Sequence, residues 1–320
     1  KRLVKSGQVE MVAGGYYEPI LPLIPDRDKA GQLKMHLDFI KKETDCQAMG
    51  AWLAERVWEP YLARIFSQAG ISYTVVDDSH FELAGKKVDE ILGYYITEED
   101  GYKLALFPSS KKLRYNMPFR MPAETIDYLR AAATPDGTRA VTFGDDGEKF
   151  GLWPGTHKWV YEEKWLENFF KALEDNSDWV KVLTPSQYMK EHEPLGRLYI
   201  PCASYPEMLE WSGGYFRNFL VKYPEANWMQ KRMAYASDRL AALGGEKLPG
   251  YNRAREALYR SQCNCAYWHG VFGGLYLHHL RTAVYKNIID AENIMNDSAA
   301  LKDQGWTETA DIDKDSMDEV

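Results

Sequence analysis

The hydrophobic positions along the chain follow two periods, one typical of strands and the other of helices. Short apolar runs predict strands at residues 9–13, 48–53, 71–76, 102–107 and 139–143. Between them, apolar residues spaced three or four apart predict helices at residues 26–43, 60–70, 122–133 and 158–174. Because strands that alternate with helices form parallel sheets covered by helices, we expect an α/β fold, either doubly wound or a barrel.

The pattern changes near residue 205, where the strand signal fades. Long helical stretches are predicted at residues 215–242 and 252–296. We therefore expect an α/β unit over residues 1–204, an α-helical subdomain over residues 205–296, and an acidic tail over residues 297–320.

Composition and charge narrow the class of protein. Of the 320 residues, 45% are hydrophobic and 27% charged, which is typical of a globular protein, and no apolar run of about 18 residues predicts a membrane span. The net charge of -8 disfavours nucleic acid as a partner. Four cysteines are too few for a disulfide scaffold, so we expect a reduced, cytoplasmic setting. Aromatic residues reach 13%, which favours a surface for stacking.

Carboxylates follow several of the predicted strands at the point where each strand ends. They come from four separate segments of the chain: Glu18, Glu55, Asp77 with Asp78, and Asp145 with Asp146. Because the carboxyl ends of parallel strands share one face of the sheet, these groups are expected to converge there. The alternative for any single position is that the carboxylate caps the following helix.

Two facing carboxyl groups can cleave an acetal, since one attacks the anomeric carbon while the other protonates the leaving oxygen. A metal site is disfavoured, because the seven histidines form neither H-x-x-x-H nor H-E-x-x-H. A serine nucleophile in G-x-S-x-G and a phosphate-binding loop are also missing from the sequence. We therefore expect no metal and no cofactor.

Four segments in order carry a resemblance to a known family: AGGYYEPI (13–20), GAWLAERVWEP (50–60), DDGEKFGLWPG (145–155) and AYWHGVFGG (266–274). They resemble glycoside hydrolase family 57, in its branch of 4-α-glucanotransferases and α-amylase-like members. The segment at residues 219–233 resembles the helical region of that branch. The resemblance implies an incomplete (β/α)7 barrel followed by an α-helical bundle.

The resemblance also implies roles for individual residues. Glu55 matches the nucleophile and Asp146 the general acid/base, so retention of configuration would place their carboxyl groups about 5–5.5 Å apart. Residues that match substrate-binding positions, or that are candidates to contact sugar hydroxyls, are Glu18, Trp52, Asp78, His80, Trp153 and Trp268.

Neighbouring groups are expected to adjust the two catalytic carboxyls. Arg56 is expected to hold the pKa of Glu55 down, and burial beside Trp153 to raise the pKa of Asp146. Arg114 is a candidate to orient a carboxylate.

The implied function is a retaining enzyme acting on α-1,4-glucans, with a maltooligosaccharide as its partner and neither nucleic acid nor a membrane. We expect a 4-α-glucanotransferase. A hydrolytic α-amylase and a non-catalytic α-glucan-binding fragment are the alternatives, and a metal-dependent deacetylase is disfavoured by the missing histidine pair. A homodimer of the full-length enzyme is left open.

The sequence departs from the family in two informative ways. The family's H-x-H-Q-P strand has no match here, and its C-terminal β-sandwich would begin where this chain ends, so we interpret the sequence as an internal fragment of low activity on its own. Cys265 stands where the family usually has an aspartate, which affects the expected sugar contacts.

Overall fold

The sheet occupies the centre of the molecule and runs mostly parallel. The computed structural model describes residues 1–298, 309–312 and 314–318. Within them the strands are β1 (Val12–Ala13), β2 (Gly50–Trp52), β3 (Tyr73–Asp77), β4 (Tyr95–Glu99) and β5 (Tyr102–Ser109). Their order is β1-β2-β3-β5-β4, with β4 antiparallel to β5 and the other neighbours parallel. The expected α/β fold with a parallel sheet, an incomplete barrel, is confirmed.

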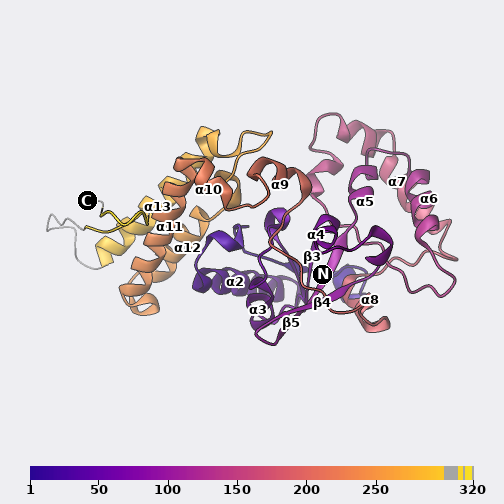
Figure 1. Cartoon of the computed structure of the whole chain (residues 1–320), viewed down its shortest axis with the longest axis horizontal. Coiled ribbons are helices and arrows are strands. Elements are labelled where there is room, and N and C mark those ends of the chain that lie inside the picture. The colour runs from indigo at the N-terminus through magenta and orange to yellow at the C-terminus, as the bar shows by residue number, and fades with distance from the viewer. Residues whose placement is uncertain (299–308, 313, 319–320) are drawn as a thin grey trace.

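The helices divide into those around the sheet and those of a C-terminal bundle. They are α1 (Arg2–Lys5), α2 (Asp26–Thr44), α3 (Leu62–Gln68), α4 (Asp78–Leu83), α5 (Lys111–Asn116), α6 (Pro122–Ala132), α7 (Trp165–Glu174), α8 (Pro185–Glu191), α9 (Pro206–Ser212), α10 (Asn218–Lys222), α11 (Pro224–Ala242), α12 (Tyr251–Ser261) and α13 (His278–Ser298). In Figure 1, α10 to α13 lie on the left, the sheet with α2 and α3 in the middle, and α5 to α7 on the right. The expected helical region after the sheet is therefore present.

The sheet and the helical bundle share one hydrophobic core. Every residue of β3 is buried, as expected for a central parallel strand covered on both faces. The same core cluster contains Leu33 of α2, Val76 of β3, Met233 of α11 and Ile288 of α13. The bundle is thus packed onto the α/β part, so its position relative to the sheet is fixed by burial.

One predicted strand is not formed in the structure, and one strand of the structure was not predicted. Residues 139–143 form no strand, since Thr142 makes only a single bridge to Ser109, and the Ser109 hydroxyl takes over the hydrogen bonding of the Gly144 main chain. Strand β4 was not predicted. It pairs with β5 through a turn in which Asp100 and Gly101 have φ of 52° and 81°.

The long helical predictions are interrupted at local breaks. The predicted helix 158–174 is broken at Lys164, whose φ is 60°, and the stretch 215–242 breaks before Pro224. The stretch 252–296 is interrupted between α12 and α13. There Gly274 has a φ of 42°, and a Cβ on it would lie 2.2 Å from the main-chain oxygen of Trp268, so only glycine fits.

Parts of the expected acidic tail, residues 299–308, 313 and 319–320, lie outside the described residues. In the part of the chain that the structure describes, no helix has both the length and the apolar character needed to cross a lipid bilayer.

Candidate active site

Glu55 and Arg56 form a strained turn directly after β2. Both residues have left-handed backbone conformations, with φ of 52° and 48°. Such conformations cost about 1–3 kcal/mol each in non-glycine residues and persist only where the surroundings hold them. Here the Ser204 hydroxyl donates to the Glu55 carbonyl oxygen at 2.6 Å, and Nε2 of His80 contacts the Arg56 carbonyl oxygen at 3.0 Å. The turn is therefore fixed from outside its own segment.

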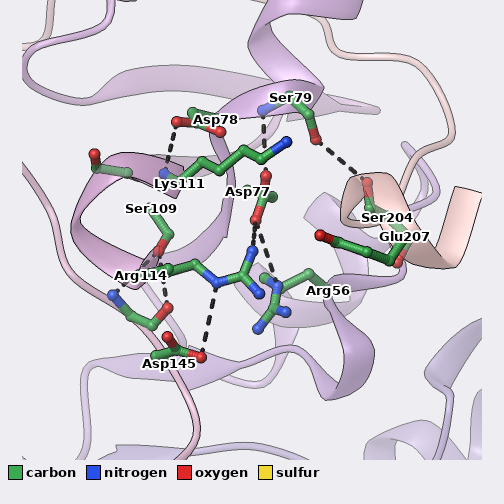
Figure 2. Close-up of polar contacts among 12 residues, drawn as sticks. Arg56, Asp77, Asp78, Ser79, Ser109, Lys111, Arg114, Asp145, Ser204 and Glu207 are labelled. Atoms are coloured by element: carbon green, nitrogen blue, oxygen red, sulfur yellow. Dashed lines mark hydrogen bonds and ion pairs between the residues drawn. The ribbon is translucent and has the colours of Figure 1, made fainter. Parts of the chain in front are cut away.

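A row of alternating buried charges runs from this turn to the loop after residue 143. Asp77, which is fully buried, accepts a hydrogen bond from Nη1 of Arg114 at 2.7 Å, and the same carboxylate oxygen lies 3.8 Å from Nε of Arg56. Nε of Arg114 lies 3.7 Å from Oδ1 of Asp145. The other carboxylate oxygen of Asp145, Oδ2, pairs with the buried Lys149. Figure 2 shows Asp77 between the two guanidinium groups and Asp145 beyond Arg114. Arg114, a candidate to orient a carboxylate, thus pairs with both Asp77 and Asp145.

The row ends beside Asp146. Oδ1 of Asp145 accepts from the Asp146 main-chain N–H at 2.9 Å. Asp146 is the N-cap residue of the 3₁₀ turn Gly147–Phe150, but its side chain makes no capping hydrogen bond. Capping therefore does not account for this carboxylate.

The carboxyl groups of Asp146 and Glu18 lie near enough to Glu55 for their charges to act on it. Burial raises the pKa of Glu55 to about 7, Arg56 and a hydrogen bond from Tyr205 lower it, and the charges of Asp146 and Glu18 raise it again. The expected effect of Arg56 is present, but desolvation outweighs it, so the prediction of a depressed pKa is wrong.

Glu18 and Asp146 respond to the same surroundings. Desolvation, followed by the charges of Asp146 and Glu148, raises the pKa of Glu18. The pKa of Asp146 is raised, as expected, by desolvation and by Asp145 and Glu148, against the effects of Arg56 and Arg114. Glu18 also has a left-handed backbone, with φ of 53°. The charge of Asp146 thus acts on both Glu55 and Glu18, which come from two other segments of the chain.

The three indoles of the predicted site differ in exposure. Trp153 is 41% exposed and stacks on Phe119 with ring centroids 6.0 Å apart. Trp52 is half-buried, 5.5 Å from the Arg56 guanidinium. Trp268 is buried, with Nε1 donating to Asn264, and stacks on a further indole, Trp211. Trp153 presents the largest free ring surface of the three.

Asp78 and His80 both contact the main chain. His80 has no exposed surface, and its two ring nitrogens contact the carbonyl oxygens of Asp77 and Arg56, each at 3.0 Å. Burial lowers its pKa to about 4, so the imidazole is neutral at pH 7. The buried Asp78 accepts from the main-chain N–H of Lys111 at 2.8 Å, at the start of α5. His80 therefore leaves no surface for a sugar hydroxyl, whereas Asp78 uses one carboxylate oxygen on the main chain and stays a candidate.

Two further residues lie at the site: Tyr205, which the sequence did not point to, and Cys265, which stands where the family usually has an aspartate. Tyr205 interacts with Glu55 and packs 4.5 Å from the Arg56 guanidinium. Cys265 lies where the charges of Glu55 and Glu18 act on it, and with burial they raise its pKa to about 12. No local pattern marks Tyr205, since its role depends on a contact with a segment far away in the chain. In the described residues, no group of three or more histidine, cysteine, aspartate or glutamate side chains is arranged to hold a metal ion.

Known proteins resemble both parts of the chain. The profile of glycosyl hydrolase family 57 matches residues 1–201, and that of the alpha-amylase/4-alpha-glucanotransferase middle domain matches residues 214–295. The chain is 45% identical to alpha-amylase 1 of Dictyoglomus thermophilum, over 93% of this chain and 48% of that protein. It is 40% identical to 4-alpha-glucanotransferase of Thermococcus litoralis, over 98% of this chain and 50% of that protein. The chain thus spans about half the length of the curated relatives it matches.

Solved structures agree with these matches. The crystal structure of 4-alpha-glucanotransferase from Thermococcus litoralis superposes with a TM-score of 0.91, over 99% of this chain and 52% of that chain. A family 57 branching enzyme from Pyrococcus horikoshii shares the fold, with a TM-score of 0.73 at 15% identity, over 96% of this chain and 68% of that chain. From the family profile and the relatives at 40–45% identity, the chain belongs to glycosyl hydrolase family 57.

Proposed function

We propose that this chain carries the catalytic centre of a retaining 4-α-glucanotransferase that acts on α-1,4-glucans. The observation that carries the proposal is the convergence of Glu55, Asp146 and Glu18: the charges of Asp146 and Glu18 raise the pKa of Glu55, and the charge of Asp146 raises the pKa of Glu18. Facing carboxyl groups are what cleavage of a glycosidic bond requires. Two relatives of this chain are named alpha-amylase 1 and 4-alpha-glucanotransferase, and these names support α-glucans as the substrate class.

In the proposed reaction, a Glu55 oxygen attacks the anomeric carbon of the bound glucan. The bond from that carbon to the leaving oxygen breaks, and Asp146 gives its proton to that oxygen. The product is a glycosyl ester on Glu55. In the second step Asp146 takes a proton from the 4-hydroxyl of an acceptor glucan, whose oxygen displaces Glu55.

The electrostatics of the site suit these roles. A pKa of about 7 leaves Glu55 half ionised at neutral pH, and Arg56 and Tyr205 favour the ionised form. The raised pKa of Asp146 favours the protonated form that a general acid requires. Trp153, Trp52 and Glu18 are proposed to bind the sugar rings. Trp268, buried against Trp211, is proposed to shape the subsite from behind.

The proposal includes the division of the chain into a catalytic unit over residues 1–204 and a helical unit over residues 205–296. The two family profiles support it, since one ends at residue 201 and the other begins at residue 214.

Hydrolysis is the second candidate, favoured by the 45% identity to a protein named alpha-amylase 1. The two reactions share the glycosyl ester and differ in the acceptor, so exclusion of water decides between them. Incubation of the full-length protein with maltotriose tests the choice. A ladder of longer maltooligosaccharides supports transfer, whereas glucose and maltose alone support hydrolysis and overturn the transferase.

The nucleophile is tested with Glu55→Gln. We expect loss of turnover with retained maltooligosaccharide binding, measured by calorimetry. The matched control is Glu292→Gln, which removes a carboxylate paired with Arg232 at 2.7 Å in the helical bundle and is expected to keep turnover. Unchanged turnover in Glu55→Gln removes Glu55 from the mechanism. Binding without turnover in the natural protein supports a glucan-binding role instead.

A further inference from the structure

The segment Ala203–Tyr205 completes the site from the junction between the two predicted units. Ala203 pairs with Trp58 through main-chain hydrogen bonds of 2.8 and 3.1 Å. The next residue, Ser204, donates its hydroxyl to the Glu55 carbonyl and accepts at its own carbonyl from Ser79 at 3.4 Å. These contacts fix the main chain directly before the residue that carries the Tyr205 ring.

The Tyr205 ring lies against two cations. Its centroid lies 4.5 Å from the Arg56 guanidinium and 5.7 Å from that of Arg114, and Trp211 packs against it edge-to-face at 6.3 Å. Only 8% of the residue is exposed. Because both guanidinium groups are themselves tied to Asp77, the ring has little freedom to move.

The hydroxyl group of this ring interacts with the carboxyl group of Glu55. Tyr205 acts on the Glu55 carboxyl in the way a hydrogen-bond donor does, since it lowers the pKa of Glu55. Burial and the Glu55 charge raise the pKa of Tyr205 above its usual value, so it keeps its proton over the working pH range and acts as a donor.

We propose that Tyr205 is a further active-site residue, which donates a hydrogen bond to the nucleophile carboxylate of Glu55 and, packed against Arg56 and Arg114, keeps that carboxylate aimed at the anomeric carbon. This role rests on the proposed function of Glu55.

The hydrogen bond follows the charge through the reaction. It is strongest to the ionised Glu55, weakens when the glycosyl ester forms and the oxygen charge is lost, and returns when the acceptor displaces Glu55. The tyrosine proton stays on Tyr205 throughout, since Asp146 gives the proton in the first step and takes the acceptor's proton in the second.

Besides burial, which has the largest effect, neighbouring groups of the described residues influence the ionisation of the Glu55 carboxyl. Arg56 and Tyr205 favour the charged form, while Asp146 and Glu18 oppose it. The Cys265 thiol is neutral at pH 7, since its pKa is raised to about 12. Removal of the tyrosine hydroxyl therefore shifts the balance toward protonated Glu55.

Tyr205→Phe in the full-length protein tests the proposal, because phenylalanine keeps the ring and loses only the hydroxyl. We expect kcat for maltotriose to fall about 10- to 100-fold and the acid limb of the kcat/KM profile to move to higher pH. The matched control is Tyr215→Phe, which deletes a hydroxyl that donates to the buried Glu59 at 3.2 Å outside this site, and it is expected to leave the profile unchanged.

The outcomes separate this proposal from the proposed function. A dead Glu55→Gln with a Tyr205→Phe variant that matches the natural protein in kcat and pH profile overturns the role of Tyr205 alone. Retained turnover in Glu55→Gln overturns the assignment of the nucleophile itself. If Tyr205→Phe fails to fold, a fluorotyrosine at position 205, whose hydroxyl is a stronger donor, is expected to move the acid limb to lower pH, and no movement overturns the proposal.

Discussion

Arg114 donates to the carboxylate of Asp77 at 2.7 Å, in a place where Asp77 has no contact with solvent. The same carboxylate oxygen is the nearest anion to Arg56, at 3.8 Å. One buried charge thus ties the end of β3 to the residue that follows Glu55 and to the arginine that pairs with Asp145. Both candidate catalytic carboxyls, Glu55 and Asp146, are chain neighbours of members of this row.

Asp77→Asn is expected to destabilise the protein by about 3–5 kcal/mol, because it leaves two buried guanidinium groups without their shared anion. Urea unfolding at pH 7 measures the change. The control is Glu256→Gln, whose partner Arg260 lies at 2.6 Å on the surface with both side chains about half exposed. This exposed pair is expected to contribute less than about 1 kcal/mol. A loss in Asp77→Asn no larger than in the control contradicts the ion-pair row.

Glu55→Gln is expected to stabilise the protein at pH 8 by up to about 3.5 kcal/mol, since each unit of pKa shift corresponds to about 1.4 kcal/mol. The pKa of Glu55 rises from 4.5 to about 7 on folding, so protonation favours the folded state. That contribution is fully present below about pH 4.5 and is lost as the pH rises through about 7.

Urea unfolding of the natural protein and of Glu55→Gln at pH 5 and pH 8 measures this effect. We expect the free energy of unfolding of the variant to exceed that of the natural protein by a large amount at pH 8 and by a small amount at pH 5. An equal gain at both values contradicts the raised pKa of Glu55 as its source.

Trp153→Ala is expected to weaken maltooligosaccharide binding about tenfold, or about 1.4 kcal/mol, because it removes the exposed ring that stacks on Phe119. Little loss of stability is expected, since the indole is 41% exposed. Trp228→Ala is the matched control, with 37% exposure on α11 in the helical bundle. Equal effects of the two variants on affinity, measured by calorimetry, argue against a role of Trp153 in the subsite.

Cys265→Asp is expected to move the acid limb of the kcat/KM profile upward by about half to one pH unit. The new carboxylate would stand where Glu55 and Glu18 already repel negative charge, and like charges raise the pKa of a carboxyl group. The neutral Cys265→Ser is expected to leave the limb in place. A downward shift in Cys265→Asp shows that position 265 does not face Glu55.

Local signals predicted the parts of the fold that depend on neighbours in the chain. The predicted helix 26–43 is present as α2 (Asp26–Thr44). It could be predicted because its apolar period and its start after Pro25 depend only on residues within the segment. The strand prediction for residues 139–143 was wrong because a strand needs a partner ladder, and the Ser109 hydroxyl replaced it. The hairpin strand β4 was missed for the complementary reason, since its partner β5 stabilises it.

The sequence by itself determined the α/β fold, the helical bundle and the carboxylates at the ends of strands, because hydrophobic period and motif order are properties of short segments. Only the tertiary structure decided that His80 and Asp78 serve the backbone, that burial outweighs Arg56 at Glu55, and that the 204–205 segment holds the Glu55 turn. Ser204 and Glu55 are 149 positions apart. Burial and long-range hydrogen bonds depend on which segments pack together, and no local pattern records that.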